Sequence, residues 1–310
     1  MADESPDLAK DLGLLAALTI GIGTMVGAGI FVLPGPAVAR AGPATVLGFV
    51  LAGAIALLTA LSVAELGTAM PKAGGAFHYI NQALGPFFGS IAGWGNWLGL
   101  AFASAFYMVG FAEYIGTVLP VSGLAVAGVS LSGVQVVAVV GSLLFVGINY
   151  IGARETGLVQ VAIVLLLVAI LVVFAVVGLA RSSPVAVLGV LGDAPRMDAV
   201  LPVTGFIFVS YLGFVQITSV GEEIRDPGRN LPIAVIGSVV FVTLVYTVAL
   251  VTLLVSADIG IIADNTTAVI DVARLLMGPA GAVLLLVGGL LATASSANAS
   301  ILASSRINFA

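Results

Sequence analysis

The residues best placed to do chemistry in this chain are glycines rather than reactive side chains. Residues 21–31 read GIGTMVGAGIF, and four glycines there interrupt a long apolar run. Each glycine costs about 1 kcal/mol against alanine in a helix interior. Residues 23–29 are therefore expected to be unwound. Its freed N–H groups would then suit a carboxylate, and its freed C=O groups would suit an ammonium or a sodium ion.

A second interruption is expected five apolar stretches later. Residues 206–223 read FIFVSYLGFVQITSVGEE, with Gly213 near the middle. Non-helical backbone is tolerated at membrane depth only where protein buries it or where it lines a wet cavity. Two corresponding interruptions are typical of inverted-repeat transporters with a site at the midplane. The alternative is close helix packing, since Gly23 and Gly27 have small-xxx-small spacing and a lone glycine is ordinary in a membrane helix.

The side-chain inventory excludes most other chemistry. Cysteine is absent and His78 is the single histidine, which excludes a thiolate metal site, a cysteine nucleophile and a Ser/His/Asp triad. No Gly-x-x-x-x-Gly-Lys-Ser/Thr phosphate loop occurs. The net charge is −5, and without a basic cluster no nucleic-acid partner is expected. The sequence thus predicts a protein that is not an enzyme.

Composition indicates the elements that must hold these glycines. The 310 residues are 60% hydrophobic and 8% charged, with a mean hydropathy of +1.23, whereas soluble domains carry about 25% charged residues. A membrane helix needs about 20 apolar residues. Runs such as 161–177 are continuously apolar, which favours helices over the alternating strands of a barrel. The eight predicted spans are 12–33, 43–69, 88–119, 131–150, 157–180, 199–221, 231–256 and 276–304.

The predicted fold is all-α: a polytopic membrane helix bundle forming one transmembrane domain over residues 1–310. The side that holds both termini carries six basic residues: Lys10, Lys72, Arg154, Arg225, Arg229 and Arg306. The opposite side carries four: Arg40, Arg181, Arg196 and Arg274. The positive-inside rule then predicts a cytoplasmic N-terminus in the cell membrane.

Two kinds of connection are expected between the spans. Residues 70–89, on the inner side, predict a re-entrant or interfacial segment, and the sequence leaves both open. The outer connections are expected to be short and to carry little structure; they are 34–42, 120–130, 181–198 and 257–275.

Four stretches resemble the amino acid–polyamine–organocation (APC) superfamily of amino acid permeases, and together they cover nearly the whole chain. They are residues 21–31, 64–94, 209–232 and 295–310. The resemblance implies an inverted five-plus-five helix repeat with broken first and sixth helices. The first repeat would cover about 12–180, and a partial second repeat, about 199–310, would be truncated after helix eight.

The function implied by this resemblance is secondary transport of amino acids across the cell membrane by alternating access, as symport or antiport. Two alternatives remain open at this point. One is an amino-acid-binding membrane sensor or channel-like protein. The other is an inactive, truncated fragment of a permease. The sequence does not indicate which amino acid is carried or the oligomeric state.

The resemblance also implies which backbone groups bind substrate. Those facing the substrate carboxylate would be the amides of Thr24, Gly27, Ala28 and Gly29. Those facing the α-amine would be the carbonyls of Ile22, Phe208, Val209 and Leu212. Gly213 would permit the break in the sixth span. Family members often have an aromatic gate at the position of Val209, so side-chain closure is expected to differ here.

Coupling to an ion is a separate expectation, and no other cofactor is predicted. The carbonyls of Gly21 and Thr24 and the hydroxyls of Ser295 and Ser296 are hard oxygen ligands that suit sodium. The alternative is that these hydroxyls only hydrogen-bond their own or neighbouring helices. Some proton-coupled members carry a lysine on the fifth span at a position that aligns with Leu167. No lysine lies on that span here, which argues against lysine-gated proton coupling. Sodium symport, exchange or facilitated uptake therefore remain.

Overall fold

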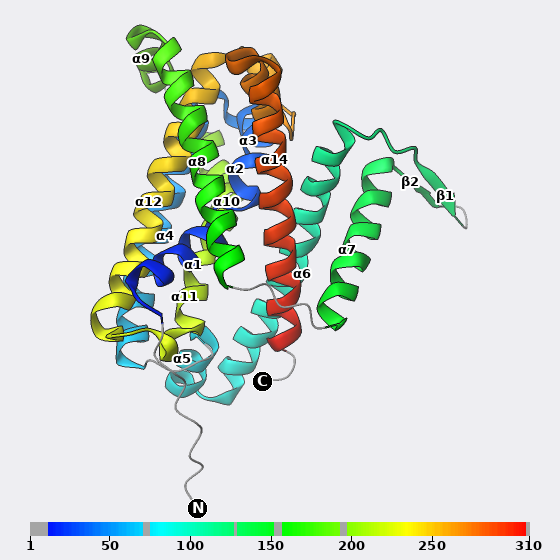
Figure 1. Cartoon of the computed structure of the whole chain (residues 1–310). Helices are drawn as coiled ribbons and strands as arrows, with labels where there is room; N and C mark the ends of the chain where they lie inside the picture. The colour runs from blue at the N-terminus through cyan, green and yellow to red at the C-terminus, as the bar shows by residue number, and fades with distance from the viewer. Residues whose placement is uncertain (1–11, 71–74, 127–128, 152–156, 193–196, 308–310) are drawn as a thin grey trace, which may run out of the picture.

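Long apolar helices make up most of the computed structural model, which describes residues 12–70, 75–126, 129–151, 157–192 and 197–307 (Figure 1). Within those ranges, eight helical segments are long and apolar enough to cross a membrane. This confirms the predicted polytopic helical bundle with eight spans. The segments are Leu14–Val32, Pro34–Ala69, Pro86–Gly116, Gly133–Ile151, Val159–Arg181, Asp198–Ser219, Pro227–Ser256 and Ala268–Ser305.

Several spans consist of more than one helical element. The helices in chain order are α1 (Leu14–Met25), α2 (Ala28–Val32), α3 (Pro34–Ala41), η1 (Gly42–Ala44), α4 (Thr45–Ala69), α5 (Gly75–Leu84), α6 (Pro86–Gly116), α7 (Gly133–Ile151), α8 (Gly157–Arg181), α9 (Pro184–Gly192), α10 (Met197–Phe208), η2 (Val209–Val215), α11 (Gln216–Ser219), η3 (Gly221–Glu223), α12 (Pro227–Ser256), α13 (Ile259–Ile262) and α14 (Ala268–Ile307). The strands are β1 (Leu124–Val126) and β2 (Val129–Leu131).

Small residues allow the central helices to pack closely. Ala52, Ala56 and Ala60 recur every four residues on α4 and are fully buried. A Cβ added at Gly53 would lie closer than 3.0 Å to Thr243 of α12, so the α4 and α12 backbones approach closely there. In lipid, such small-residue contacts supply the packing that a hydrophobic effect between helices cannot. Helix α1 packs against α12, α8 and η2, and α14 packs against α6 and α8.

Helix α5 lies at the end of the bundle where α1 begins and α14 ends (Figure 1). Ten residues of helix rise about 15 Å, half of the roughly 30 Å hydrocarbon thickness, so α5 within the predicted segment 70–89 does not span. It packs against α6 and α11. Its Tyr79 is buried; burial raises the pKa of the Tyr79 hydroxyl, and a hydrogen bond with Thr218 of α11 opposes that shift.

The outer connections contain short helices and strands. The stretches 34–42, 181–198 and 257–275 contain α3, α9 and α13. The stretch 120–130 contains β1 and all but the last residue of β2, and the two strands pair antiparallel with Leu124 opposite Leu131. Two of these helices begin at a proline, Pro34 and Pro184. Proline is favoured at the first helical position, where its missing N–H is not needed.

The eighth span also begins earlier than predicted. Helix α14 starts at Ala268, and Gly278, at φ 68°, kinks it just before Pro279. The predicted start at residue 276 therefore falls at the kink rather than at the helix end. Only a glycine adopts that left-handed conformation without strain.

Candidate functional site

The first span is interrupted at two residues. Helix α1 ends at Met25, and α2 begins at Ala28. Gly27, between them, has φ −119° and ψ −142°, outside the helical region. The Val26 N–H donates to the Ile22 carbonyl at 2.6 Å and so closes α1. The first N–H groups of α2 precede any acceptor within their own helix.

The sixth span changes its helix type instead of unwinding. Helix α10 ends at Phe208, the chain continues as the 3₁₀ segment η2, and α11 follows from Gln216. The residues flanking η2, Phe208 and Gln216, keep helical dihedral angles. Runs of 3₁₀ helix longer than three or four residues are uncommon and often mark a functional hinge. The seven residues of η2 exceed that length.

The two interrupted segments touch at Gly213. A Cβ added there would lie 2.7 Å from the Met25 backbone nitrogen and closer still to the Thr24 carbonyl group. The Thr24 hydroxyl lies 2.8 Å from the Gly213 carbonyl oxygen and 2.8 Å from that of Ile20 in its own helix. A hydroxyl has one proton to donate, so these two carbonyls compete for it. The contact between the segments is therefore made mainly by backbone.

Buried tyrosines donate to carbonyl groups at the end of α1 and within α2, on either side of the first interruption. The Tyr246 hydroxyl of α12 donates to the Met25 carbonyl at 2.5 Å, and the Tyr114 hydroxyl of α6 donates to the Phe31 carbonyl at 2.7 Å. The Tyr246 ring packs edge-on against Tyr211 of η2, with centroids 5.6 Å apart. Buried carbonyls need such partners, so neighbouring helices fix the interruption in place.

A cavity of about 510 Å³ lies beside the contact. Its walls come from α1, η2, α11, α14, α8, α6 and α5. This volume falls in the range of small-molecule sites, roughly 300–1,000 Å³. The structure brings six of the predicted site residues together in its lining: Thr24, Val209, Leu212, Gly213, Ser295 and Ser296.

The remaining predicted residues lie outside that lining. Gly27 is separated from it by Ser296: a Cβ at Gly27 would lie closer than 3.0 Å to the Ser296 hydroxyl. Gly21 faces Ile217 and Ser238 in the core. The predicted residues outside the lining are Gly21, Ile22, Gly27, Ala28, Gly29 and Phe208.

Sequence reasoning missed three amide side chains that line the cavity: Asn96, Gln160 and Gln216. The Ser295 hydroxyl donates to Gln160 Oε1 at 3.3 Å, and a Cβ at Gly23 would lie 3.5 Å from Gln160 Nε2. Polar side chains within membrane spans are costly and mark functional positions. That signal was present in the sequence, because all three residues fall inside predicted spans.

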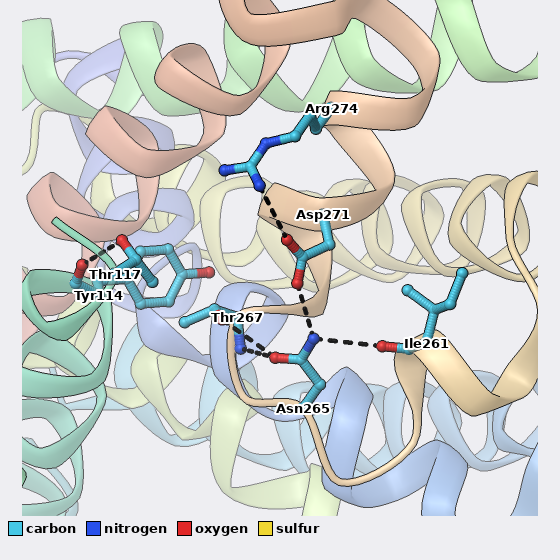
Figure 2. Close-up of polar contacts among 7 residues, drawn as sticks. All are labelled: Tyr114, Thr117, Ile261, Asn265, Thr267, Asp271 and Arg274. Atoms are coloured by element: carbon cyan, nitrogen blue, oxygen red, sulfur yellow. Dashed lines mark hydrogen bonds and ion pairs between the residues drawn. The ribbon is translucent and has the colours of Figure 1, made fainter.

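A polar network lies at the opposite end of the bundle, in the loop before α14 and in its first turns (Figure 2). Asn265 Oδ1 accepts from the Thr267 N–H and hydroxyl, each at 3.0 Å, and Asn265 Nδ2 donates to Asp271 at 2.9 Å. Arg274 lies 3.8 Å from Asp271. A Cβ at Gly35 would lie closer than 3.0 Å to the Asn265 backbone, so α3 packs directly on this loop.

Known proteins similar to this chain are transporters rather than enzymes. Residues 16–310 match the family described as amino acid permease. The serine/threonine exchanger SteT of Bacillus subtilis is 30% identical over all of this chain and 70% of its own length. An uncharacterised transporter of Mycobacterium bovis is 32% identical over 75% of this chain and 50% of its own length.

A plant relative is similar at a comparable level. Cationic amino acid transporter 1 of Arabidopsis thaliana is 29% identical over 80% of this chain and 42% of its own length. The chain thus spans about half the length of several curated relatives that it matches. With a family match over 16–310 and eight apolar helices, the chain is a multi-pass membrane protein that belongs to the amino acid permease family of the amino acid–polyamine–organocation superfamily.

Proposed function

We propose that this chain forms the core of a secondary transporter that moves amino acids across the cell membrane by alternating access. One observation carries the proposal: two interrupted spans, distant in sequence, meet at Gly213 beside a cavity. An amino acid zwitterion presents an anion and a cation, and freed peptide groups suit both. The serine/threonine exchanger and the cationic amino acid transporter among its relatives support an amino acid substrate.

The proposed substrate contacts fall into two groups. Thr24, Val209, Leu212 and Gly213 already line the cavity. The amides of Gly27, Ala28 and Gly29 and the carbonyls of Ile22 and Phe208 lie behind its wall. For a carboxylate to reach those amides, the Ser296 side chain has to turn away from Gly27. Substrate binding is then expected to include movement of α14 relative to the first interruption.

An opening toward one end supports alternating access. The cavity extends to Phe77 and Ile80 of α5, Ser219 of α11 and Ala303 of α14, all at the same end of the bundle. The lining of this cavity includes no residue of the Asn265 network at the opposite end, where Thr267 lines a separate cavity. We propose that the open end is cytoplasmic, together with the N-terminus. Three basic residues behind that orientation, Lys10, Lys72 and Arg154, lie outside the described residues.

The proposed internal symmetry pairs the two interruptions. The first repeat would cover about residues 12–180 and the partial second repeat about 199–310, which places α1 and η2 at corresponding positions. A hinge in each repeat is what rocking of one repeat against the other requires.

Ion coupling is proposed at the junction of α1, α8 and α14. Thr24, Ser295 and Ser296 line the cavity there, and Gln160 adds an amide oxygen. Hydroxyl and carbonyl oxygens are the ligand types that hard cations accept. Gly21, the fourth predicted ligand, is buried against α12. Amino acid uptake with sodium replaced by choline, at two pH values, separates sodium symport from proton coupling and from ion-independent exchange.

The test of the proposed function is counterflow in proteoliposomes that contain the purified chain. Vesicles preloaded with an unlabelled amino acid mixture should accumulate labelled amino acids saturably and faster than empty vesicles. Ligand-dependent conductance would instead favour a channel, and binding without uptake would favour a sensor. If neither uptake nor binding occurs for any amino acid, the chain is an inactive fragment and the proposal fails.

A further inference from the structure

We propose that the cavity selects amino acids whose side chains are uncharged and carry a hydroxyl or amide, with Asn96 and Gln216 as the specificity-determining residues. This inference rests on the proposed function and deepens it, because it assigns a substrate class to the same cavity.

The wall of the cavity is mostly apolar and contains several polar groups but no charged side chain among the described residues. Among the described residues that line it, none is Asp, Glu, Lys or Arg. Its polar side chains are the hydroxyls of Ser, Thr and Tyr and the amides of Asn96, Gln160 and Gln216. The acidic residue of the third span, Glu113, lines a different cavity of about 380 Å³ with Thr117 and Thr267.

A charged substrate side chain would therefore enter without a counter-charge. The α-carboxylate and α-ammonium of any amino acid balance each other, and the peptide groups of the interrupted spans suit both. A third charge, as on arginine or glutamate, would lose hydration and gain no opposite charge in the wall. An unpaired charge moved away from water is far more costly than a hydrogen-bonded neutral group.

Two of the three amides are free to contact such a side chain. Gln160 is already engaged by the Ser295 hydroxyl at 3.3 Å. Asn96, on α6, is exposed to the cavity, and Gln216, at the start of α11, is half-buried. Neither side chain is hydrogen-bonded within the part of the chain that the structure describes. Each amide offers two donors and an acceptor, which matches the mixed donor and acceptor character of serine, threonine, asparagine and glutamine.

Direct binding to the purified full chain in lipid nanodiscs tests the inference. Labelled serine, glutamine, arginine and glutamate are each titrated by a scintillation proximity assay. Serine and glutamine should bind, and arginine and glutamate should bind at least about 100-fold more weakly, since an unmatched charge loses several charge-assisted hydrogen bonds. Equal binding of arginine or glutamate would overturn the inference and leave the proposed function intact.

Carboxylate variants test the two named residues. Asn96→Asp and Gln216→Glu each place a negative charge in the wall, so arginine binding should rise about tenfold, the equivalent of one new charged hydrogen bond. The matched control is Ser90→Asp, which adds the same charge at an exposed position of α6 outside the cavity lining and should leave arginine binding unchanged.

The remaining outcomes bear on the roles of Asn96 and Gln216 and on the proposed function. If both cavity variants remain monodisperse and arginine binding does not rise, Asn96 and Gln216 do not set specificity. Should one variant fail to fold, the other carries the test. If no labelled amino acid binds to the unmodified chain, the proposed function fails, and this inference fails with it.

Discussion

The first and sixth spans both depart from regular α-helix, but their backbone hydrogen bonds are satisfied in different ways. In the first, the chain leaves the helix at Val26 and Gly27, and the residues around the gap are buried: Met25 and Val26 are each 1% exposed. In the second, the chain stays wound as η2, and its Val209 and Leu212 are 45% and 46% exposed. The first interruption is buried in the protein, whereas η2 of the sixth span forms part of the cavity wall.

The difference follows from which groups hydrogen-bond to the backbone of each segment. Non-helical backbone at membrane depth needs hydrogen-bond partners. At the first interruption the Val26 and Gly27 N–H groups donate to the Ile22 and Met25 carbonyls, and the Tyr246 hydroxyl adds an outside donor to Met25. A 3₁₀ segment keeps its own i→i+3 bonds, so η2 can face an open cavity without outside donors. We infer that the first interruption is held rigidly by its neighbours and that the second is the more adaptable surface.

The largest expected effect is that of Gly213→Ala, which acts where the two segments touch. The new Cβ would collide with the backbone of Thr24 and Met25, and backbone cannot move aside as a side chain can. We expect a loss of about 3 kcal/mol of stability, at the upper end of overpacking costs, and loss of amino acid binding. Thermal unfolding followed by tryptophan fluorescence, with binding measured in parallel, checks both.

The matched control for that variant is Gly205→Ala on α10. No atom lies within 4 Å of a Cβ at Gly205, so alanine there should leave stability and binding close to those of the unmodified chain. If Gly213→Ala behaved like this control, the contact between the segments would not be what joins them.

The next largest effect is expected from Gly29→Ala, just beyond the first interruption. A Cβ there would lie closer than 3.0 Å to the Ser210 Cβ of η2 and 3.3 Å from the Tyr246 hydroxyl. We expect a destabilisation of about 2 kcal/mol from overpacking. Adding Ser210→Gly removes the obstructing atom and should restore about half of that loss. Strictly additive effects in the double variant would contradict a direct contact between the two segments.

The spans were predictable because they depend on local properties of the chain, whereas the expected breaks were only partly so. Unwinding expected over 23–29 is limited to Val26 and Gly27, and the sixth span stays wound as η2. Glycines at 21, 23, 27 and 29 weaken a helix whatever surrounds it, and Gly213 marked the second site. Apolar stretches of about 20 residues locate membrane helices without knowledge of packing. The roles expected of Thr24 and Gly213 in substrate binding rested on the family resemblance and stay predictions; both residues lie in the lining of one cavity.

Features that depend on packing between distant helices were not predictable from the sequence. Whether a glycine-containing span unwinds or becomes a 3₁₀ helix depends on which tyrosines reach it. The fifth span shows the same limit: Leu167 packs in the apolar core at 1% exposure, whereas Gln160, two turns earlier, faces α1 and α14. One helix thus presents very different surroundings to residues seven positions apart.

A smaller effect is expected from Tyr246→Phe, which tests whether the first interruption depends on outside donors. The change removes the hydroxyl that donates to the Met25 carbonyl at 2.5 Å and leaves the ring packing intact. The Met25 carbonyl still accepts from the Gly27 N–H at 2.8 Å, so we expect a loss of about 1.5 kcal/mol, the upper end of the net contribution of one hydrogen bond. Tyr150→Phe is the control, because Tyr150 is 92% exposed. Equal melting temperatures for the two variants would contradict the anchoring role of Tyr246.

The smallest effect is expected from Thr24→Val, which removes the single side-chain hydrogen bond donated by Thr24 to the second segment. The Thr24 hydroxyl has an alternative acceptor in Ile20 of its own helix, so its link to Gly213 is shared, and the loss should be about 1 kcal/mol or less. Thr24→Ser keeps the hydroxyl and should melt within measurement error of the unmodified chain. If Thr24→Val were as damaging as Gly213→Ala, the two segments would be joined by this hydroxyl rather than by backbone contact, and the second interruption would be as dependent on an outside donor as the first.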